Sequence, residues 1–315
     1  MKITVLDLDT LGNDLDLSPL TALGDCAFFP STRPEDLAAR LANSDVAILN
    51  KIKMTRSVLE AAPKLKLICV AATGFDNIDL SACRERGIGV CNVPGYSTQS
   101  VAMVTFSLVL SLMTHLPEFS RFVSSGDYTA SGLPNCLKPS FHDLCGKTWG
   151  IVGYGNIGKK VAQVAEAFGC KVLYYRAKAD ENACDIDTLC RRSDIISLHC
   201  PLNDGTRNLI SRERLALMKP SAILVNTARG AVCDEEAVAD AILSGQLGAF
   251  GCDVYAQEPL IADHPYRAIL DKDNVCLTPH IAWASFEART KVVQEMAANI
   301  AAFTQGALRN RVELP

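Results

Sequence analysis

Three polar residues in the second half of the chain could do chemistry together, and each follows a short apolar segment. The segments and the residues beyond them are 222–226 with Arg229, 249–254 with Glu258, and 275–278 with His280. If the segments are parallel strands, their carboxyl ends meet at one edge of a sheet, where such sheets bind ligands. Taken singly, each residue is more typical of a loop or a strand end. Three of them at successive strand ends favour an active site.

The side chains indicate the reaction. Histidine changes its charge near neutral pH, so His280 could give or take a proton. A glutamate beside it would orient the ring and favour its protonated form, and an arginine offers a forked donor that matches a carboxylate. Together with a cofactor that carries hydride, these residues suit the reduction of a carbonyl whose neighbour is a carboxylate.

A glycine-rich segment predicts that cofactor. Residues 149–158 form a short apolar strand that runs into Gly-x-Gly-x-x-Gly. A helical pattern over residues 159–168, a stop at Gly169 and a strand over Lys171–Tyr175 complete a dinucleotide-binding unit. Its glycines permit a tight turn and bring the pyrophosphate close to the helix N-terminus. The residues expected to bind the phosphates are Gly153, Tyr154, Gly155, Asn156, Ile157 and Gly158.

The residue that should choose between NAD and NADP departs from the NAD pattern. An acid at the end of the second strand would accept hydrogen bonds from the adenosine ribose. This chain has Arg176 there. A cation cannot accept those bonds, but it can pair with a 2′-phosphate. The sequence therefore favours NADP(H), with NAD(H) as the alternative.

Strands and helices alternate along most of the chain, which predicts parallel sheets covered on both faces. The first ninety or so residues form one such lobe without a glycine-rich loop. Ser97 or Thr98 begins a helix to about His115 that is apolar nearly all round, which predicts a position between lobes or in a subunit interface. Residues 124–143 are rich in Ser, Gly, Pro and Asn and are expected to be irregular.

The last helix, from about residue 285 to 303, comes too late to belong to the second sheet, so we expect it to return to the first lobe. The predicted fold class is α/β, with two Rossmann-like or flavodoxin-like lobes, each on a parallel sheet, the first of them discontinuous. The first lobe would comprise residues 1–97 and 284–315. Residues 98–283 would form the NAD(P)-binding Rossmann domain.

Composition argues against several classes of protein. The 315 residues are 49% hydrophobic, with a net charge of −4 and no basic cluster, so nucleic-acid binding is not expected. The N-terminus lacks the apolar segment of a signal peptide, and residues 101–113, the best candidate for a membrane span, are too few. Thirteen scattered cysteines without C-x-x-C spacing indicate reduced thiols in a cytoplasmic protein and no metal site.

Over essentially its whole length the chain resembles the D-isomer-specific 2-hydroxyacid dehydrogenases. The segments that carry the resemblance are residues 71–79, 150–158, 226–230, 253–259 and 278–285. The likeness implies that Arg229, Glu258 and His280 are catalytic. It implies that substrate is also held by the backbone N–H groups of Thr73 and Gly74 and by Trp283. The remaining residues expected to contact the cofactor are Cys200, Pro201, Thr206, Thr227, Ala228, Arg229, Asp253 and His280, with Asp253 against the nicotinamide amide.

In that family the substrate lobe combines the N-terminal part with the last helix, and members are usually homodimers built around the long helix after the first lobe. Residues 92–98 and Trp283 look most like the glycerate dehydrogenase (hydroxypyruvate reductase) branch. This predicts reduction of hydroxypyruvate or glyoxylate to the D-2-hydroxy acid, with branched or aromatic 2-keto acids as alternatives. The His-x-Ala-Trp pattern also occurs in C-terminal-binding-protein corepressors, so a dinucleotide-sensing binding protein is the second hypothesis. Formate dehydrogenase of this superfamily has glutamine in place of the acid, so Glu258 argues against it.

Overall fold

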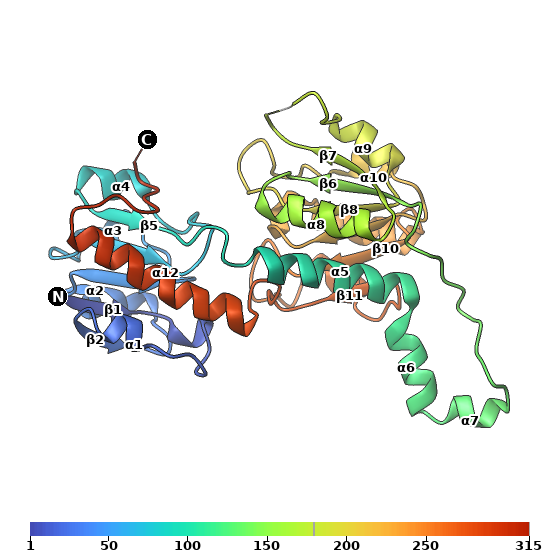
Figure 1. Cartoon of the computed structure of the whole chain (residues 1–315), viewed down its shortest axis with the longest axis horizontal. Coiled ribbons are helices and arrows are strands. Elements are labelled where there is room, and N and C mark those ends of the chain that lie inside the picture. Colours follow the sequence, from blue (N-terminus) through green and yellow to red (C-terminus); the bar gives the residue numbers. More distant parts are fainter. Residues whose placement is uncertain (179, 315) are drawn as a thin grey trace. The chain divides into compact units, whose positions relative to one another are not determined.

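The protein folds into two compact units, each built on its own parallel sheet (Figure 1). The computed structural model describes residues 1–178 and 180–314. Unit 1 comprises Met1–Ser97 and Ala284–Pro315, and unit 2 comprises Thr98–Trp283. The predicted α/β class with two parallel sheets is confirmed.

Unit 1 contains a five-stranded sheet in the order β2-β1-β3-β4-β5, with every neighbouring pair parallel. Its strands are β1 (Lys2–Val5), β2 (Asp25–Phe28), β3 (Val46–Leu49), β4 (Leu67–Val70) and β5 (Gly89–Cys91). β3 and β4 are buried at every residue, because uninterrupted apolar runs suit strands covered on both faces. The connections hold η1 (Leu8–Thr10), α1 (Ser18–Thr21), η2 (Pro34–Asp36), α2 (Leu37–Leu41), α3 (Arg56–Glu60) and α4 (Leu80–Glu85).

The final helix, α12 (Phe286–Thr304), packs in unit 1 against α1 and β4, after the chain has passed through the whole of unit 2 (Figure 1). Arg289 donates to the Asp14 carboxylate at 2.9 Å, and Asn299 donates to the Asn92 carbonyl at 3.0 Å. These polar contacts fix both halves of the helix to the first part of the chain. Unit 1 is therefore discontinuous in sequence.

Unit 2 contains a six-stranded sheet in the order β11-β10-β9-β8-β6-β7, again parallel throughout. Its strands are β6 (Thr148–Val152), β7 (Lys171–Tyr175), β8 (Ile195–Leu198), β9 (Ile223–Asn226), β10 (Ala249–Cys252) and β11 (Val275–Leu277). After β6 the chain adds β7 on one side and then crosses to place β8 on the other. Such a reversal of strand order opens a crevice for ligands at the carboxyl ends of the strands.

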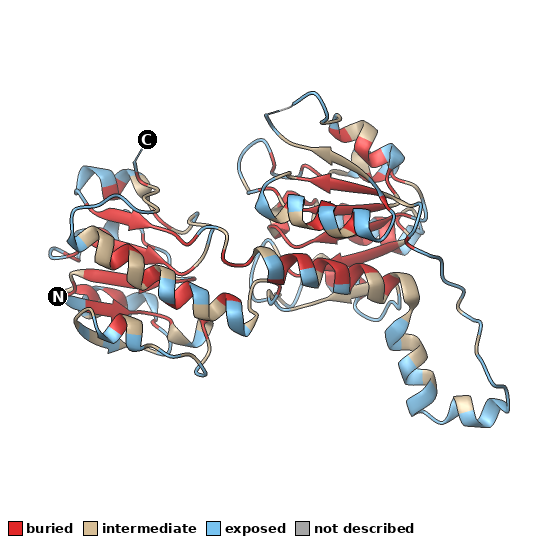
Figure 2. Cartoon of the chain, viewed as in Figure 1, coloured by how far each residue is buried: buried red, intermediate tan, exposed pale blue. Residues whose placement is uncertain are grey.

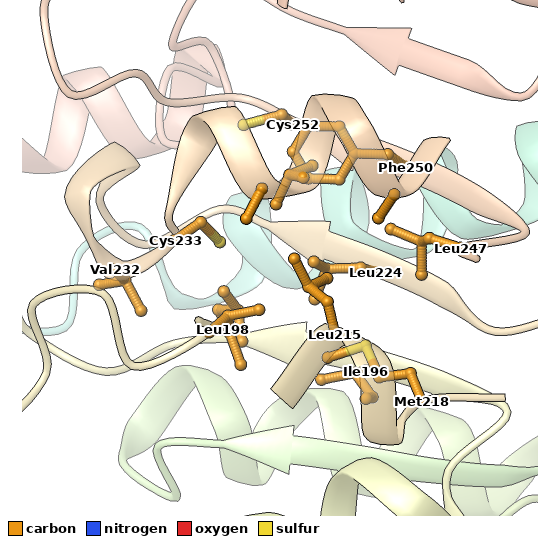
Figure 3. Packing of buried hydrophobic residues seen from close by; sticks show 14 of the residues in the cluster. Ile196, Leu198, Leu215, Met218, Leu224, Val232, Cys233, Leu247, Phe250 and Cys252 are labelled. Atoms are coloured by element: carbon orange, nitrogen blue, oxygen red, sulfur yellow. The ribbon is translucent and has the colours of Figure 1, made fainter. Parts of the chain in front are cut away.

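Helices cover both faces of this second sheet (Figure 2). One face carries α5 (Thr98–Thr114) and α8 (Asn156–Ala167), and the other carries α9 (Ile186–Arg192), α10 (Arg212–Leu217), α11 (Glu235–Ser244) and the 3-10 helices η3 (Gly230–Val232) and η4 (Pro265–Ile269). Figure 3 shows the core between the sheet and the second of these helix layers. There Leu198, Leu224 and Phe250, from three strands, pack in one cluster with Leu215 and Met218. α5 therefore covers the sheet of its own unit, a role that its apolar sequence did not predict.

Two short helices lie in the region that separates α5 from β6. α6 (Leu116–Ser124) follows α5 directly, because His115 adopts a φ of 51° and breaks the first helix. α7 (Asp127–Ser131) is bounded by Gly126 and Gly132, with φ of 87° and 64°. The expectation of an irregular segment at 124–143 is therefore wrong for residues 127–131, because glycine in the left-handed region can delimit a helix as well as a loop. Within the described residues no single helix is long and apolar enough to span a membrane; α5 and α6 reach that length only as a pair bent by 62°.

Candidate active site

The carboxyl edge of the sheet in unit 2 carries the predicted site residues in spatial order. From β11 to β7, the residues beyond the strand ends are His280, Asp253, Arg229, Cys200, the loop at 153–158 and Arg176. The three residues expected to be catalytic follow three neighbouring strands, β9, β10 and β11. The phosphate loop follows β6, beside the point where the strand order reverses.

Arg229 follows β9 and is positioned by Asn226, the last residue of that strand. The fully buried Asn226 side chain accepts a hydrogen bond from the Ala228 N–H at 3.0 Å and donates one to the Arg229 carbonyl at 2.9 Å. The Arg229 guanidinium donates to the Ala228 carbonyl at 2.8 Å. These bonds fix the turn that carries the guanidinium at the edge of the sheet.

Gly230 allows the loops after β9 and β10 to touch. A side chain there would place its Cβ 2.0 Å from the Ala256 nitrogen and 2.0 Å from the Tyr255 carbonyl carbon. No side chain fits in that space, so only glycine permits this approach. The turn of Arg229 therefore packs directly on the loop that leads to Glu258.

Glu258 and His280 meet across the ends of β10 and β11. Glu258 Oε2 lies 2.6 Å from His280 Nδ1, and Glu258 Oε1 accepts the Tyr255 N–H at 3.1 Å. The two side chains are 29% and 21% exposed, so the pair is partly desolvated and still accessible. Because a carboxylate only accepts hydrogen bonds, Nδ1 carries a proton and Nε2 is the ring nitrogen directed away from Glu258. This arrangement suits proton transfer at Nε2.

Asp253 organises the turn that carries His280. Its buried carboxylate accepts hydrogen bonds from Thr278 Oγ1 at 2.6 Å and from the N–H groups of Ile281 and Ala282, both at 2.8 Å. Burial raises the pKa of the Asp253 carboxyl, against the hydrogen bonds that favour its ionised form. The backbone between these contacts places His280 at a φ of 55°, a left-handed conformation that is uncommon for this residue type. The expected nicotinamide contact of Asp253 stays a prediction.

The loop at 153–158 leaves room for a pyrophosphate. Gly153 has a φ of 98° and packs on the end of β8, where a Cβ would lie 2.6 Å from the Cys200 nitrogen. Nothing lies within 4 Å of the Cβ position of Gly155, so open space borders the start of α8. That helix begins without a side-chain cap, as expected where backbone N–H groups bind an anion. These residues therefore fit a dinucleotide.

Arg176 lies in a polar cluster beside the glycine loop. It donates to Asp180 at 3.2 Å, and the Tyr174 hydroxyl donates to the other oxygen of that carboxylate at 2.6 Å. The bond from Tyr174 and the Arg176 charge lower the pKa of Asp180, and the same bond raises the pKa of Tyr174 to about 12. The Tyr174 ring stacks on Tyr154, with centroids 3.8 Å apart. Arg176, the residue expected to choose between NAD and NADP, is thus paired with an acid, which the sequence pattern did not predict.

A hydrogen-bond chain runs from the core to the ends of β8 and β9. Trp149 Nε1 donates to Ser197 Oγ at 2.9 Å, and Ser197 Oγ lies 3.0 Å from His199 Nε2. His199 Nδ1 lies 3.4 Å from Thr227 Oγ1, which lies 3.2 Å from Thr105 Oγ1. Because Trp149 only donates, Ser197 Oγ accepts that bond, and its hydroxyl hydrogen is available to a ring nitrogen of the neutral His199. Burial lowers the pKa of His199 to about 3.

We expect acid to destabilise the protein through His199. Its pKa is about 3 in the folded state and near 6.5 in the unfolded chain, so between these values only the unfolded chain binds the proton. The stability that the neutral His199 ring contributes is fully present at pH values above its pKa in the unfolded chain. It is lost as the pH falls toward its pKa in the folded state, by at most about 1.4 kcal/mol per pH unit. Urea unfolding of wild type, His199→Asn and the control His142→Asn between about pH 4 and 7 measures the dependence. His199→Asn should flatten it, and equal slopes in all three proteins would contradict the assignment.

The loop after β8 is shaped by its own side chains. Thr206 Oγ1 donates to the Pro201 carbonyl at 2.7 Å and accepts the Asn203 N–H at 2.8 Å. Cys200 is buried, and burial raises the pKa of its thiol to about 11, so the thiol stays neutral. Pro201 and Thr206 were expected to line the cofactor groove. The structure gives Thr206 a role in the loop itself, and the cofactor contacts of all three residues stay predictions.

Thr73 and Gly74 lie in unit 1, in the loop after β4. Thr73 Oγ1 donates to the Val93 carbonyl at 3.0 Å, and Asn92 Nδ2 donates to the Thr73 carbonyl at 2.8 Å. These bonds tie the loop to the segment after β5. Trp283, the last residue of unit 2, is partly exposed after the turn of His280. The substrate contacts of Thr73, Gly74 and Trp283 stay predictions.

Sequence reasoning missed residues that support the loop before Glu258. Tyr255 donates its hydroxyl to the Thr278 carbonyl at 2.9 Å, Glu235 accepts the Ala256 N–H at 2.9 Å, and His264 lies 3.0 Å from Glu235. No local signal marks them. Glu235 has the pattern of an ordinary acid in the first turn of a helix, and His264 that of a loop residue.

Comparison with known proteins gives consistent similarities. Residues 106–282, inside unit 2, match the model of the family described as D-isomer specific 2-hydroxyacid dehydrogenase, NAD binding domain. The chain is 39% identical over 280 residues to a glycerate dehydrogenase of Methylorubrum extorquens, covering 89% of each chain. It is 35% identical over 323 residues to a hydroxypyruvate reductase of Blautia hydrogenotrophica, covering 99% of each. A solved D-lactate dehydrogenase of Aquifex aeolicus, complexed with NAD and lactic acid, is 30% identical, with a TM-score of 0.86 and 100% of both chains covered.

Proposed function

Because the chain belongs to the D-isomer-specific 2-hydroxyacid dehydrogenases, we propose that it reduces a small 2-keto acid, hydroxypyruvate or glyoxylate, to the 2-hydroxy acid. The family predicted from the sequence is confirmed, and the protein is an oxidoreductase that acts on the CH–OH group with a nicotinamide dinucleotide. The Glu258–His280 pair, 2.6 Å apart at the strand ends next to Arg229, is the observation that carries the proposal. Relatives named for glycerate and hydroxypyruvate support a small substrate.

Each residue of the proposed site has a distinct task. Arg229 binds the substrate carboxylate through two parallel N–H bonds and so orients the neighbouring carbonyl. His280 donates a proton from Nε2 to the carbonyl oxygen as negative charge develops there, and takes it back in the reverse direction. Glu258 holds the ring through Nδ1 and stabilises its protonated form. The N–H groups of Thr73 and Gly74 in unit 1 provide further donors for the carboxylate. When bound to unit 2 along residues 153–158, the dinucleotide supplies the hydride.

A panel of keto acids tests this function. Purified protein is supplied with NADPH or NADH and with hydroxypyruvate, glyoxylate, pyruvate, a branched 2-keto acid and phenylpyruvate, and the nicotinamide absorbance is followed. We expect the highest kcat/KM for hydroxypyruvate or glyoxylate. A preference for the branched or aromatic acids would overturn the substrate assignment. Binding of the dinucleotide without turnover on any keto acid would overturn the enzymatic function and favour a sensing protein.

We propose that NADPH is the preferred form of the cofactor. Arg176 at the end of β7 supports this, because a guanidinium pairs with a 2′-phosphate and cannot accept bonds from ribose hydroxyls. Arg176 contacts Asp180, so the 2′-phosphate would compete with the Asp180 carboxylate for the Arg176 guanidinium. The measured preference then depends on both residues.

Arg176→Asp should shift the ratio of kcat/KM values for NADPH and NADH toward NADH by about 10- to 100-fold, because one charge-assisted contact contributes about 1.5–3 kcal/mol. Asp180→Asn should move the ratio the other way, since it removes the competing carboxylate. Dissociation constants of both dinucleotides, from quenching of protein fluorescence, provide a readout that does not depend on turnover. An unchanged ratio in Arg176→Asp would make this arginine only a surface charge.

We also propose that the protein is a cytoplasmic homodimer. Large apolar side chains between α5 and β6 support the dimer, because each is more than half exposed in the single chain: Leu116, Val123, Leu133, Leu137 and Phe141. Figure 2 shows α6 and α7 as mostly exposed helices, and large apolar side chains exposed in a single chain can be covered by a second copy. Eight buried thiols, which fill core positions, support a reducing compartment. Light scattering of the purified chain tests the dimer.

A further inference from the structure

A buried pair of side chains, Glu235 and His264, lies next to the loop that carries Glu258. Glu235 is the first residue of α11, with a side chain 11% exposed, and the His264 side chain, just before η4, is 3% exposed. His264 Nε2 lies 3.0 Å from Glu235 Oε2 but off the ideal hydrogen-bond direction, so the contact is mainly electrostatic. Burial of a carboxylate is costly unless polar partners compensate it, so its other contacts should explain why it is there.

The orientation of His264 is fixed by its surroundings. Its Nδ1 accepts the Tyr266 N–H at 3.1 Å and therefore carries no proton. The proton of the ring is on Nε2 and faces Glu235. The ring packs at 4.8 Å from the Tyr266 ring and, edge-on, at 5.9 Å from the Tyr255 ring. The Nε2–H of His264 thus faces one oxygen of Glu235 at 3.0 Å.

The other oxygen of Glu235 reaches the backbone of the loop. Glu235 Oε1 accepts the Ala256 N–H at 2.9 Å. The preceding residue, Tyr255, donates its N–H to Glu258 at 3.1 Å and its hydroxyl to the Thr278 carbonyl at 2.9 Å. Residues 255–256 therefore support both Glu258 and the turn after β11, and Glu235 ties these two residues to α11.

We propose that Glu235, oriented by His264, is a positioning residue that holds Glu258 at hydrogen-bond distance from His280. The proposal rests on the proposed function, since it concerns the same acid–base pair. Glu235 acts through the Ala256 backbone and takes no part in proton transfer. Such support affects the rate because a displacement of about 1 Å can lower turnover by about 100-fold.

Glu235→Gln tests the role with little change in shape. In either orientation of the amide, its NH₂ group faces one of two donors, the Ala256 N–H or the His264 Nε2–H, so one contact is lost. We expect kcat to fall at least about tenfold. The KM for the keto acid and the Kd for NADPH should stay within about twofold, because Arg229 and the glycine loop are untouched. Glu236→Gln is the matched control, since it removes the same charge from an exposed neighbour in the same helical turn and should leave kcat unchanged.

A double-mutant cycle with Glu258→Gln separates positioning from general stability. If Glu235 acts through Glu258, adding Glu235→Gln to Glu258→Gln causes no further fall in kcat. A multiplicative loss, or a rise in KM and Kd together with the fall in kcat, would overturn the proposal. Should Glu235→Gln not fold, His264→Asn takes its place, because Asn keeps an acceptor for the Tyr266 N–H and removes the group that faces Glu235.

The proposed function and the positioning role of Glu235 would be refuted by different results. Wild-type protein that reduces no keto acid would refute the proposed function. Active wild-type protein in which Glu235→Gln and Glu236→Gln are equally fast would refute the positioning role alone.

Discussion

Replacing His280 by alanine is expected to lower keto-acid turnover by about 10³-fold and to leave cofactor affinity nearly unchanged. The loss follows because His280, with Nδ1 held 2.6 Å from Glu258, is the proposed proton donor to the developing alkoxide. Cofactor affinity should change little because His280 is only one of the residues expected to contact the cofactor, and the phosphate loop follows β6, which three strands separate from β11. Steady-state reduction measures kcat, and titration of protein fluorescence with NADPH measures Kd.

A second substitution separates proton transfer from local structure. His280 has a φ of 55°, which asparagine adopts readily, so His280→Asn keeps the backbone relaxed and a donor toward Glu258. Asparagine cannot deliver a proton, so its kcat should be as low as that of the alanine variant. His142→Ala, at an exposed histidine, should behave as wild type. If His280→Asn kept a tenth or more of wild-type kcat, another group would be the proton donor.

Sequence patterns located the sheets because parallel strands buried on both faces need uninterrupted apolar runs, as in β3 and β4. The predicted strands, however, extend past the observed carboxyl ends of the strands. Asp253 and Thr278 were expected to lie in strands, and both lie beyond the ladder with their side chains in polar contacts. Hydropathy does not register this difference, since a residue that leaves a strand at the edge of the sheet can be as buried as one within it.

The order of groups along the carboxyl edge could be predicted, whereas the contacts that position them could not. Parallel strands bring Arg229, Glu258 and His280 to one edge whatever the loops do. The pair formed by Glu235 and His264 joins residues 29 positions apart and depends on how α11 and η4 pack, which no local pattern encodes. The contact between Arg176 and Asp180 likewise depends on the conformation of a loop. A single sequence therefore identified the proposed catalytic residues but not the residues whose contacts position them.

Replacing Arg229 by alanine is expected to lower kcat/KM for the keto acid by about 10³-fold, through a higher KM and a lower kcat. Loss of one partner from a charge pair in a partly desolvated site costs about 2–5 kcal/mol, which covers this range. Both constants should change because the guanidinium would hold the carboxylate in the bound substrate and keep the carbonyl aligned in the transition state. The Kd for NADPH is measured in parallel and should change little.

Arg229→Lys identifies the property of arginine that matters. Lysine keeps the positive charge but lacks the planar fork, so a bidentate contact predicts that lysine restores only a small part of the lost kcat/KM. Nearly full activity in Arg229→Lys would mean that charge alone suffices.

The backbone of the turn should stay in place in either variant, because Asn226 binds the main chain of residues 228 and 229 and not the guanidinium. Arg207→Ala, at an exposed arginine in the loop after β8, is the matched control and should leave both constants unchanged. If Arg229→Ala raised the Kd for NADPH as much as the KM for the keto acid, the arginine would be supporting the cofactor site, and the substrate carboxylate would need a different partner.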